Sequence, residues 1–130
     1  MTALVESFVI LPSESRGDTT TRDYETPRFS AADIFVRQTA QGSTTAFVSV
    51  KLQGRVPGST EYYTVATVSP STTAAFTRRL RVRAGGSTAL DSTALTTTTV
   101  NEALPAIWRI ASTNVSTSAV TYSVSANLYP

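Results

Sequence analysis

The residues best placed to do chemistry in this sequence are three arginines at alternate positions, Arg79, Arg81 and Arg83. Side chains at i, i+2 and i+4 of a β-strand project from one face about 7 Å apart, so the three guanidinium groups would form a line of positive charge. Such a line can bind nucleic-acid phosphates, bind acidic side chains of a protein partner, or be an ordinary solvated strand face. Few aromatic residues alternate with these arginines, which disfavours binding to single-stranded nucleic acid. We therefore favour a protein partner over nucleic acid.

A second charged group of residues lies between residues 13 and 30, where the only large apolar side chains are Tyr24 and Phe29. Residues 1–40 carry six acids and four arginines, whereas the other ninety residues carry three acids and seven basic residues. Oppositely charged segments can attract each other within a chain or between copies. We predict that residues 13–30 form an extended arm or loop that lies over its own sandwich or over a neighbour. Its candidate partner-binding residues are Arg16, Asp18, Arg22, Asp23 and Glu25.

Arg16, Gly17 and Asp18 spell the tripeptide known from integrin ligands. A three-residue motif often arises by chance, so the match by itself is weak. We interpret it as a charged turn around a glycine.

The sequence lacks the residues that most enzymes use for acid, base and nucleophilic catalysis. It contains no His and no Cys, which removes the commonest general base and any thiol nucleophile. A Ser or Thr nucleophile would need Lys51 as its base, and this lysine lies in the middle of a predicted strand. The acids Glu61, Asp91 and Glu102 are scattered, and no Asp-rich calcium loop or Gly-rich phosphate loop is present. We predict a non-enzymatic protein without cofactor or metal.

The elements that position these residues are predicted to be β-strands. The chain of 130 residues fits a single domain over residues 1–130, with 41% hydrophobic residues and a high content of Thr and Ser. Thr favours strands and Ser favours turns. No segment has helical periodicity, so the composition and patterning indicate an all-β fold.

The clearest element is a hairpin over residues 46–68. Its first limb alternates apolar and polar side chains, with Val48, Val50 and Leu52 on the predicted buried face. Gly54 and Pro57 are among the turn residues that separate it from the second limb. We predict about eight strands in a single antiparallel β-sandwich of jelly-roll or immunoglobulin type. The predicted strands cover residues 4–11, 34–38, 46–53, 62–68, 75–83, 95–100, 107–114 and 120–128.

Two details of this pattern are specific expectations. The first strand should end at Pro12, because proline lacks the N–H that continues a ladder. In the strand with the arginine row, Arg78 shares the apolar face, so we expect it to lie near the strand's end or to pair with an acid such as Glu102 or Asp33. Residues 1–11 do not have the pattern of a signal peptide, and no apolar run is long enough to span a membrane. We expect a soluble protein.

Four parts of the chain resemble, in the same order, small structural proteins encoded among the head genes of tailed bacteriophages. They are residues 10–16 (ILPSESR), residues 48–54 with 61–65 (VSVKLQG and EYYTV), residues 104–110 (LPAIWRI) and residues 121–128 (TYSVSANL). The corresponding family segments are LPSxxR, VxVQGxDP with YYTL, LPRTWRV and ITYSVGANL. The resemblance implies a β-sandwich that decorates and stabilises a capsid.

If the resemblance holds, the partners are the major capsid protein and other copies of the chain, as a trimer or dimer. The location is then the capsid surface of the virion, after synthesis in the cytoplasm of a bacterial host. A protein that binds only the assembled shell stabilises it by mass action. Two alternatives remain, a tail or head-tail connector component and a carbohydrate-binding module. The latter would use Tyr62, Tyr63 and Trp108, for which we favour core packing.

Overall fold

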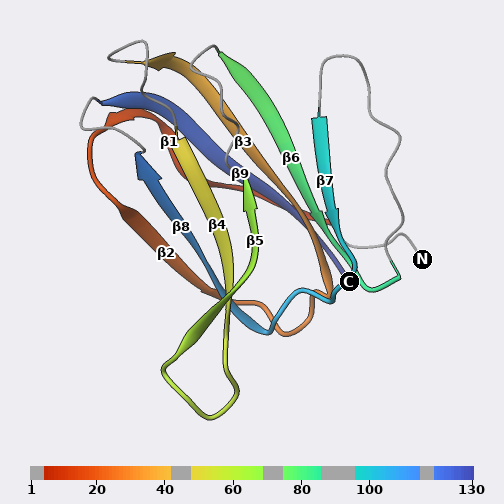
Figure 1. Cartoon of the computed structure of the whole chain (residues 1–130). Coiled ribbons are helices and arrows are strands. Elements are labelled where there is room, and N and C mark those ends of the chain that lie inside the picture. Colours follow the sequence, from red (N-terminus) through yellow and green to blue (C-terminus); the bar gives the residue numbers. More distant parts are fainter. Residues whose placement is uncertain (1–4, 42–47, 69–74, 86–95, 115–118) are drawn as a thin grey trace.

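The computed structural model describes residues 5–41, 48–68, 75–85, 96–114 and 119–130, which form nine β-strands and no helix (Figure 1). Predictions that involve Leu4, Ala46 or Asp91 lie outside the described residues. The strands are β1 (Glu6–Arg16), β2 (Thr20–Glu25), β3 (Ala31–Gln41), β4 (Val48–Arg55), β5 (Tyr62–Val68), β6 (Phe76–Val82), β7 (Thr96–Val100), β8 (Ile107–Asn114) and β9 (Val120–Tyr129). The all-β prediction is confirmed.

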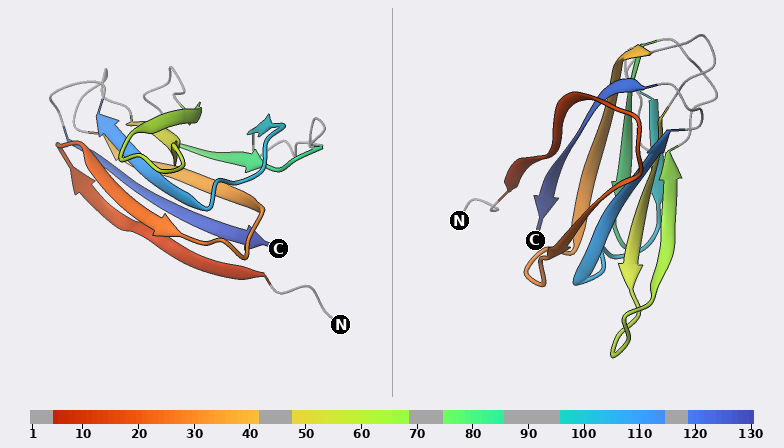
Figure 2. Two further views of the ribbon diagram at one scale, coloured as in Figure 1. Left: turned by 90° about the horizontal axis from the view of Figure 1, so that it is seen from below. Right: turned by 90° about the vertical axis from the view of Figure 1, so that its left-hand side faces the viewer.

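The strands form two sheets that face each other (Figure 2). The five-stranded sheet has the order β1-β9-β3-β6-β7, and the four-stranded sheet has the order β2-β8-β4-β5. This arrangement is compatible with the predicted β-sandwich. The expectation of a purely antiparallel structure is wrong at one place, because β7 pairs with β6 in parallel. Thirteen residues separate β6 from β7, which is enough chain for the crossover that a parallel pair requires.

The core lies between the sheets and is built from alternate residues of each strand. In β9 every second side chain is buried, and β4 and β8 follow the same period. This alternation is the reason that the sequence pattern located the strands 107–114 and 120–128 well. The buried side chains of these three strands are Val48, Val50, Leu52, Trp108, Ile110, Ser112, Val120, Tyr122, Val124, Ala126 and Leu128.

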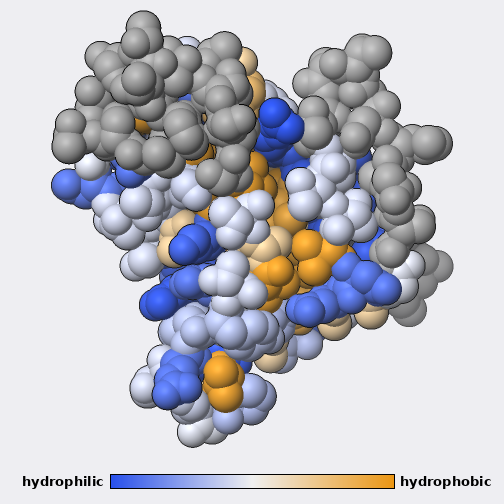
Figure 3. All heavy atoms as spheres, viewed as in Figure 1, coloured by the Kyte–Doolittle hydropathy of each residue, from blue (hydrophilic) through white to orange (hydrophobic). Residues whose placement is uncertain are grey.

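On the face shown in Figure 3, polar side chains cover much of the surface, and apolar side chains gather in the region between β5 and β7. Several apolar residues are only half-buried while they pack against the core, among them Val65 on β5, Phe76 on β6 and Val100 on β7. The core is therefore less completely covered on this side of the molecule.

The first strand continues past Pro12, contrary to the prediction, and ends at Arg16. Its pairing with β9 shifts twice, between Val9 and Leu11 and between Leu11 and Glu14, so that β1 holds one extra residue at each place. These are β-bulges, and β1 is an edge strand that pairs only with β9. A bulge on an edge strand tolerates the missing N–H of Pro12, so the proline bends the strand without ending it.

The first bulge also explains an irregularity of burial. Ile10 and Leu11 are consecutive residues and both are buried, although consecutive side chains of a regular strand point to opposite faces. The extra residue in the bulge allows both side chains to enter the core.

Residues 13–30, predicted as an extended arm or loop, are instead built into both sheets. Residues 13–16 end β1, and β2 pairs with β8 along its whole length. The anchor is Tyr24, whose ring lies 4.8 Å from that of Trp108 and 5.2 Å from that of Phe8 between centroids. The segment is charged because β2 is the edge strand of its sheet and is exposed over much of its length. A strand of this kind has the same polar sequence pattern as a loop.

Truncation of a core side chain tests the assignment of the two faces of β4. We expect Leu52→Ala to lower the free energy of unfolding by about 2–5 kcal/mol, because it leaves a cavity between the sheets. Lys51→Ala, one position away on the exposed face, should change it by less than about 0.5 kcal/mol. Urea denaturation measures both values, and equal effects would contradict the assignment.

Candidate binding surfaces

The arginine row lies on the outer face of the five-stranded sheet. Leu80 and Val82 of β6 are buried in the core, so the intervening Arg79 and Arg81 point away from it. Arg83 follows directly after β6 and is exposed, and its backbone N–H donates to the carbonyl oxygen of Val100 at 3.2 Å. The three arginines differ, however, in whether their guanidinium groups are paired with other side chains.

Arg81 is paired within the protein. Its Nε donates to Oδ1 of Asp33 at 3.0 Å and its Nη2 to Oδ2 at 3.4 Å, across the neighbouring strands β6 and β3. Asp33 is only 4% exposed, and the hydroxyl of Tyr129 also donates to its Oδ2 at 3.2 Å. The hydrogen bond to Asp33 raises the pKa of Arg81, and burial together with the charge of Asp33 raises the pKa of Tyr129. The charge of Arg81 is therefore balanced internally.

This pair also corrects an expectation about Arg78. Asp33 points to the outer face and pairs with Arg81, so it does not serve Arg78, which shares the inner face with Leu80. Arg78 is half-buried and stands opposite the fully buried Val36 of β3. The side chain of Arg78 forms no hydrogen bond or ion pair with a described residue, Glu102 included.

A further arginine belongs to this surface and was missed from the sequence. Arg37 of β3 is exposed and stands opposite Thr77 of β6, on the same outer face as Arg79. Arg79 is held by a hydrogen bond from its Nε to Oγ1 of Thr97 at 2.9 Å. Alternation along the strand could have identified it, because Arg37 follows the apolar positions Ile34 and Val36 and so falls on the opposite, outer face. We call Arg37, Arg79 and Arg83 the arginine patch.

Arg16, a predicted partner-binding residue, is used to hold the end of β1. Its guanidinium donates to the carbonyl oxygens of Pro12 at 2.6 Å and Tyr122 at 2.9 Å, and it lies 4.9 Å from the centroid of the Tyr122 ring. It also forms an ion pair with Glu14 at 3.5 Å. These contacts occupy the guanidinium, which fits the interpretation of residues 16–18 as a charged turn.

The other predicted residues of this segment lie around the corner between β1 and β2. Asp18 and Arg22 join Arg16 around a shallow hollow of about 380 Å³, whereas Asp23 and Glu25 are exposed on β2. Two strands, β9 and β3, separate β1 from β6, which corresponds to about 14 Å. The predicted residues therefore form two separate surfaces, one at the corner between β1 and β2 and one at the arginine patch.

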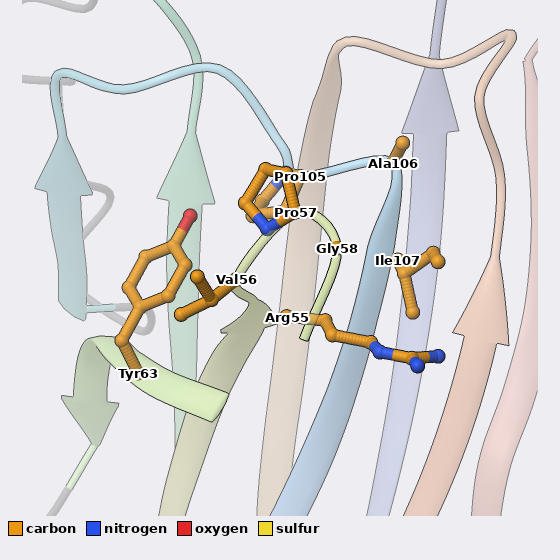
Figure 4. Close-up of a pocket in the computed structure, with 8 residues that line it drawn as sticks. All are labelled: Arg55, Val56, Pro57, Gly58, Tyr63, Pro105, Ala106 and Ile107. Carbon is orange, nitrogen blue, oxygen red and sulfur yellow. The ribbon is translucent and has the colours of Figure 1, made fainter. Parts of the chain in front are cut away.

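A pocket of about 400 Å³ lies at the turn end of the β4–β5 hairpin, beside residues 105–107 (Figure 4). Most of its lining is apolar, and its aromatic wall is Tyr63, which is 43% exposed. Gly58, in the turn, has a φ of 74°, which a glycine adopts without strain. The pocket is lined by Arg55, Val56, Pro57, Gly58, Tyr63, Pro105, Ala106 and Ile107.

Gly54 allows this pocket to form. It pairs with Tyr63 across the hairpin, and a Cβ on Gly54 would lie 2.6 Å from Cγ of Pro105 and 2.7 Å from Cζ of Tyr63. The tyrosine ring and the proline therefore close over the glycine backbone. Any side chain at this position must displace one of them.

The aromatic residues considered for carbohydrate binding have three different environments. Trp108 is fully buried and donates its Nε1–H to Oγ1 of Thr26 at 2.8 Å. Tyr62 is half-buried under the guanidinium of Arg109, which lies 3.8 Å from the ring centroid. Core packing is thus right for Trp108, while Tyr63 presents an exposed ring at the pocket.

Within the described ranges, no group of three or more His, Cys, Asp and Glu side chains is arranged to hold a metal ion. The same part of the chain contains no helix of the length and apolarity needed to cross a membrane. Comparisons of the chain with protein-family models, with curated proteins and with solved structures found no match.

Substitution of Gly54 tests how tightly the pocket wall is packed. We expect Gly54→Ala to lower the free energy of unfolding by about 1–3 kcal/mol, because the added methyl group overlaps Pro105 and Tyr63. Gly17→Ala is the matched control, because a Cβ added there would have no atom within 4 Å apart from those of its chain neighbours, and it should have an effect below about 1 kcal/mol. Thermal or urea unfolding measures both, and a neutral Gly54→Ala would contradict the packing.

The raised tyrosine pKa values predict an alkaline loss of stability. Burial raises the pKa of Tyr24, and burial with the charge of Asp33 raises that of Tyr129, above the ordinary value of 10.0. Their neutral forms thus favour the folded state fully below pH 10.0, and this contribution is lost as the pH rises through the folded-state pKa. Urea denaturation at several pH values should show a smaller alkaline decline for Tyr24→Phe/Tyr129→Phe than for the unmodified protein. Identical declines would contradict the assignment.

Proposed function

We propose that this protein is a non-enzymatic structural subunit of a virion, which binds the outside of an icosahedral phage capsid and stabilises it. The proposal starts from the four segments that resemble small virion proteins of tailed phages. Those segments are neighbours in the fold: residues 48–54, 61–65 and 104–110 fall on or beside the adjacent strands β4, β5 and β8, and residues 10–16 and 121–128 fall on the paired strands β1 and β9. A resemblance that follows the pairing of strands supports a common fold.

The observation that carries the proposed binding mode is the arginine patch on the outer face of the five-stranded sheet. Arg37, Arg79 and Arg83 add three positive charges to a face whose one described acid on β3, Asp33, is already paired with Arg81. The planar guanidinium group forms paired hydrogen bonds with carboxylates, so a surface of acidic side chains is its natural partner. In this proposal the major capsid protein supplies the acidic side chains. The proposed fold is a β-sandwich of the jelly-roll or immunoglobulin type.

Carbohydrate binding is a second candidate function, favoured by the exposed ring of Tyr63 in the pocket at the turn end of the β4–β5 hairpin. Exposed aromatic rings beside a concave surface suit the apolar faces of sugars. This candidate requires a signal on a glycan array that Tyr63→Ala abolishes, and absence of any signal would remove it.

Charge reversal tests the capsid proposal directly. We expect Arg79→Glu/Arg83→Glu to reduce occupancy on capsids that lack the protein, with an apparent affinity at least about tenfold lower, because two attractions to acids become repulsions. Arg81 is left unchanged, since a glutamate there would face Asp33 and disturb the fold. The readout is gel densitometry of purified particles after addition of each variant.

The matched control is Lys51→Glu/Arg28→Glu, which changes the net charge equally at exposed positions away from the arginine patch. It should bind like the unmodified protein. Equal occupancy for both double variants would show that the patch is not the binding surface. The copy number from the same gels separates a decoration protein, present in hundreds of copies, from a connector component, present in far fewer.

A further inference from the structure

The outer face of the five-stranded sheet carries an aromatic side chain at its centre. Phe35 lies on β3, which is the middle strand of the five. Its neighbours Ile34 and Val36 are fully buried between the sheets, so the ring of Phe35 points to the opposite, outer face. The ring is half-buried, and it is not one of the half-buried apolar side chains that pack against the core. The packing of the two sheets therefore does not account for an aromatic residue at this position.

A row of residues in register crosses this face through Phe35. Ser125 of β9 stands opposite Phe35 on one side, and Val9 of β1 stands opposite the same serine. Val9 is 61% exposed, so its side chain projects from the face. Val9 and Phe35 are two strand spacings apart, about 10 Å, with only the short side chain of Ser125 between them. This spacing leaves room for one apolar side chain of a partner.

Two members of the arginine patch lie beside the ring. Arg79 of β6 stands opposite Phe35 on its other side, and Arg37 follows two residues later on the same face of β3. The hydrogen bond from Nε of Arg79 to Thr97 holds this guanidinium group on the side of β7, away from β3. In the described ranges, no guanidinium group and no second aromatic ring stacks on Phe35. The ring therefore remains available to a partner, with two cations beside it.

This combination of side chains selects the chemistry of the partner. Aromatic residues and arginines are among the residues that contribute most to protein–protein binding, and they act from the centre of a contact with polar residues around them. The guanidinium groups favour carboxylates, and the space between Phe35 and Val9 favours an apolar side chain. A single-stranded nucleic acid would need several stacking rings along its path, whereas this row supplies one. The partner that fits is a protein segment in which acids flank an apolar residue.

We propose that Phe35, together with Val9, is the apolar anchor of the binding surface that contains the arginine patch, and that the partner inserts an apolar side chain flanked by acids. This assignment rests on the proposed function, in which the segment belongs to the major capsid protein. The arginines steer the two surfaces together and set their orientation, whereas the anchor slows their dissociation. The two contributions respond differently to salt, because screening weakens the attraction between exposed charges and leaves apolar burial intact.

Replacement of the ring tests the anchor. On capsids that lack the protein, Phe35→Ser should bind with an apparent affinity about tenfold lower than the unmodified protein, and Phe35→Leu should keep most of the binding. The factor for Phe35→Ser should be equal at low and high salt, whereas the loss caused by Arg79→Glu/Arg83→Glu should shrink as the salt concentration rises. Gel densitometry of purified particles after titration with each variant measures these affinities.

Tyr63→Ser is the matched control, because it removes an exposed aromatic ring from the other sheet, and it should bind like the unmodified protein. Urea unfolding curves identify any variant that has lost its fold. Phe35→Ser should unfold at a midpoint close to that of the unmodified protein, because its ring lies outside the core. Val9→Ser, on an exposed edge strand, is the second variant and should lower the affinity in the same direction.

The outcomes separate the anchor from the proposed function. If Phe35→Ser binds as well as Tyr63→Ser while Arg79→Glu/Arg83→Glu is weakened, the anchor is wrong and the capsid proposal stands. If the unmodified protein does not bind capsids, both are overturned. A single-stranded oligonucleotide that binds the unmodified protein but not Phe35→Ser would assign the ring to base stacking, and this result would also overturn the anchor.

Discussion

The packing around Tyr122 is the interaction on which the rest of the structure depends most. Its buried hydroxyl shares a hydrogen bond of 2.5 Å with Oγ of Ser112, which joins the interior strand β9 of one sheet to β8 of the other. Its ring lies under the guanidinium of Arg16, and its carbonyl oxygen accepts a hydrogen bond from the same group. One residue thus links both sheets to the corner between β1 and β2. The chain has no Cys and so forms no disulfide, and such satisfied polar contacts fix how the two apolar faces meet.

The sequence predicted those parts of the fold that follow a period of two. The strands β4, β8 and β9 were located because one face of each is buried and the other is not. The β1 strand past Pro12 and the whole of β2 were missed, because bulges and edge positions break that period and allow charged residues. The partner of Arg81 could not be predicted either, since cross-strand register brings Asp33 to it from 48 residues away.

The sequence predicted that a row of arginines shares one face of a strand, but the structure changes which arginines belong to the candidate binding surface. Alternation placed Arg79, Arg81 and Arg83 on one side of a strand, but only the structure distinguishes the internally paired Arg81 from the others. Arg37 enters the patch through pairing between β3 and β6, which a single strand pattern does not contain. The charged residues of the corner form a separate surface, in which Arg16 has a structural role.

The central claim is that the protein sits on the outside of a capsid with the outer face of its five-stranded sheet toward the shell. An electron cryomicroscopy reconstruction of the virion tests it most directly. The account predicts density for the two sheets on the outer capsid surface, with Arg37, Arg79 and Arg83 facing acidic side chains of the major capsid protein. Density confined to the tail, or a capsid-bound protein whose arginine patch faces solvent, would contradict it.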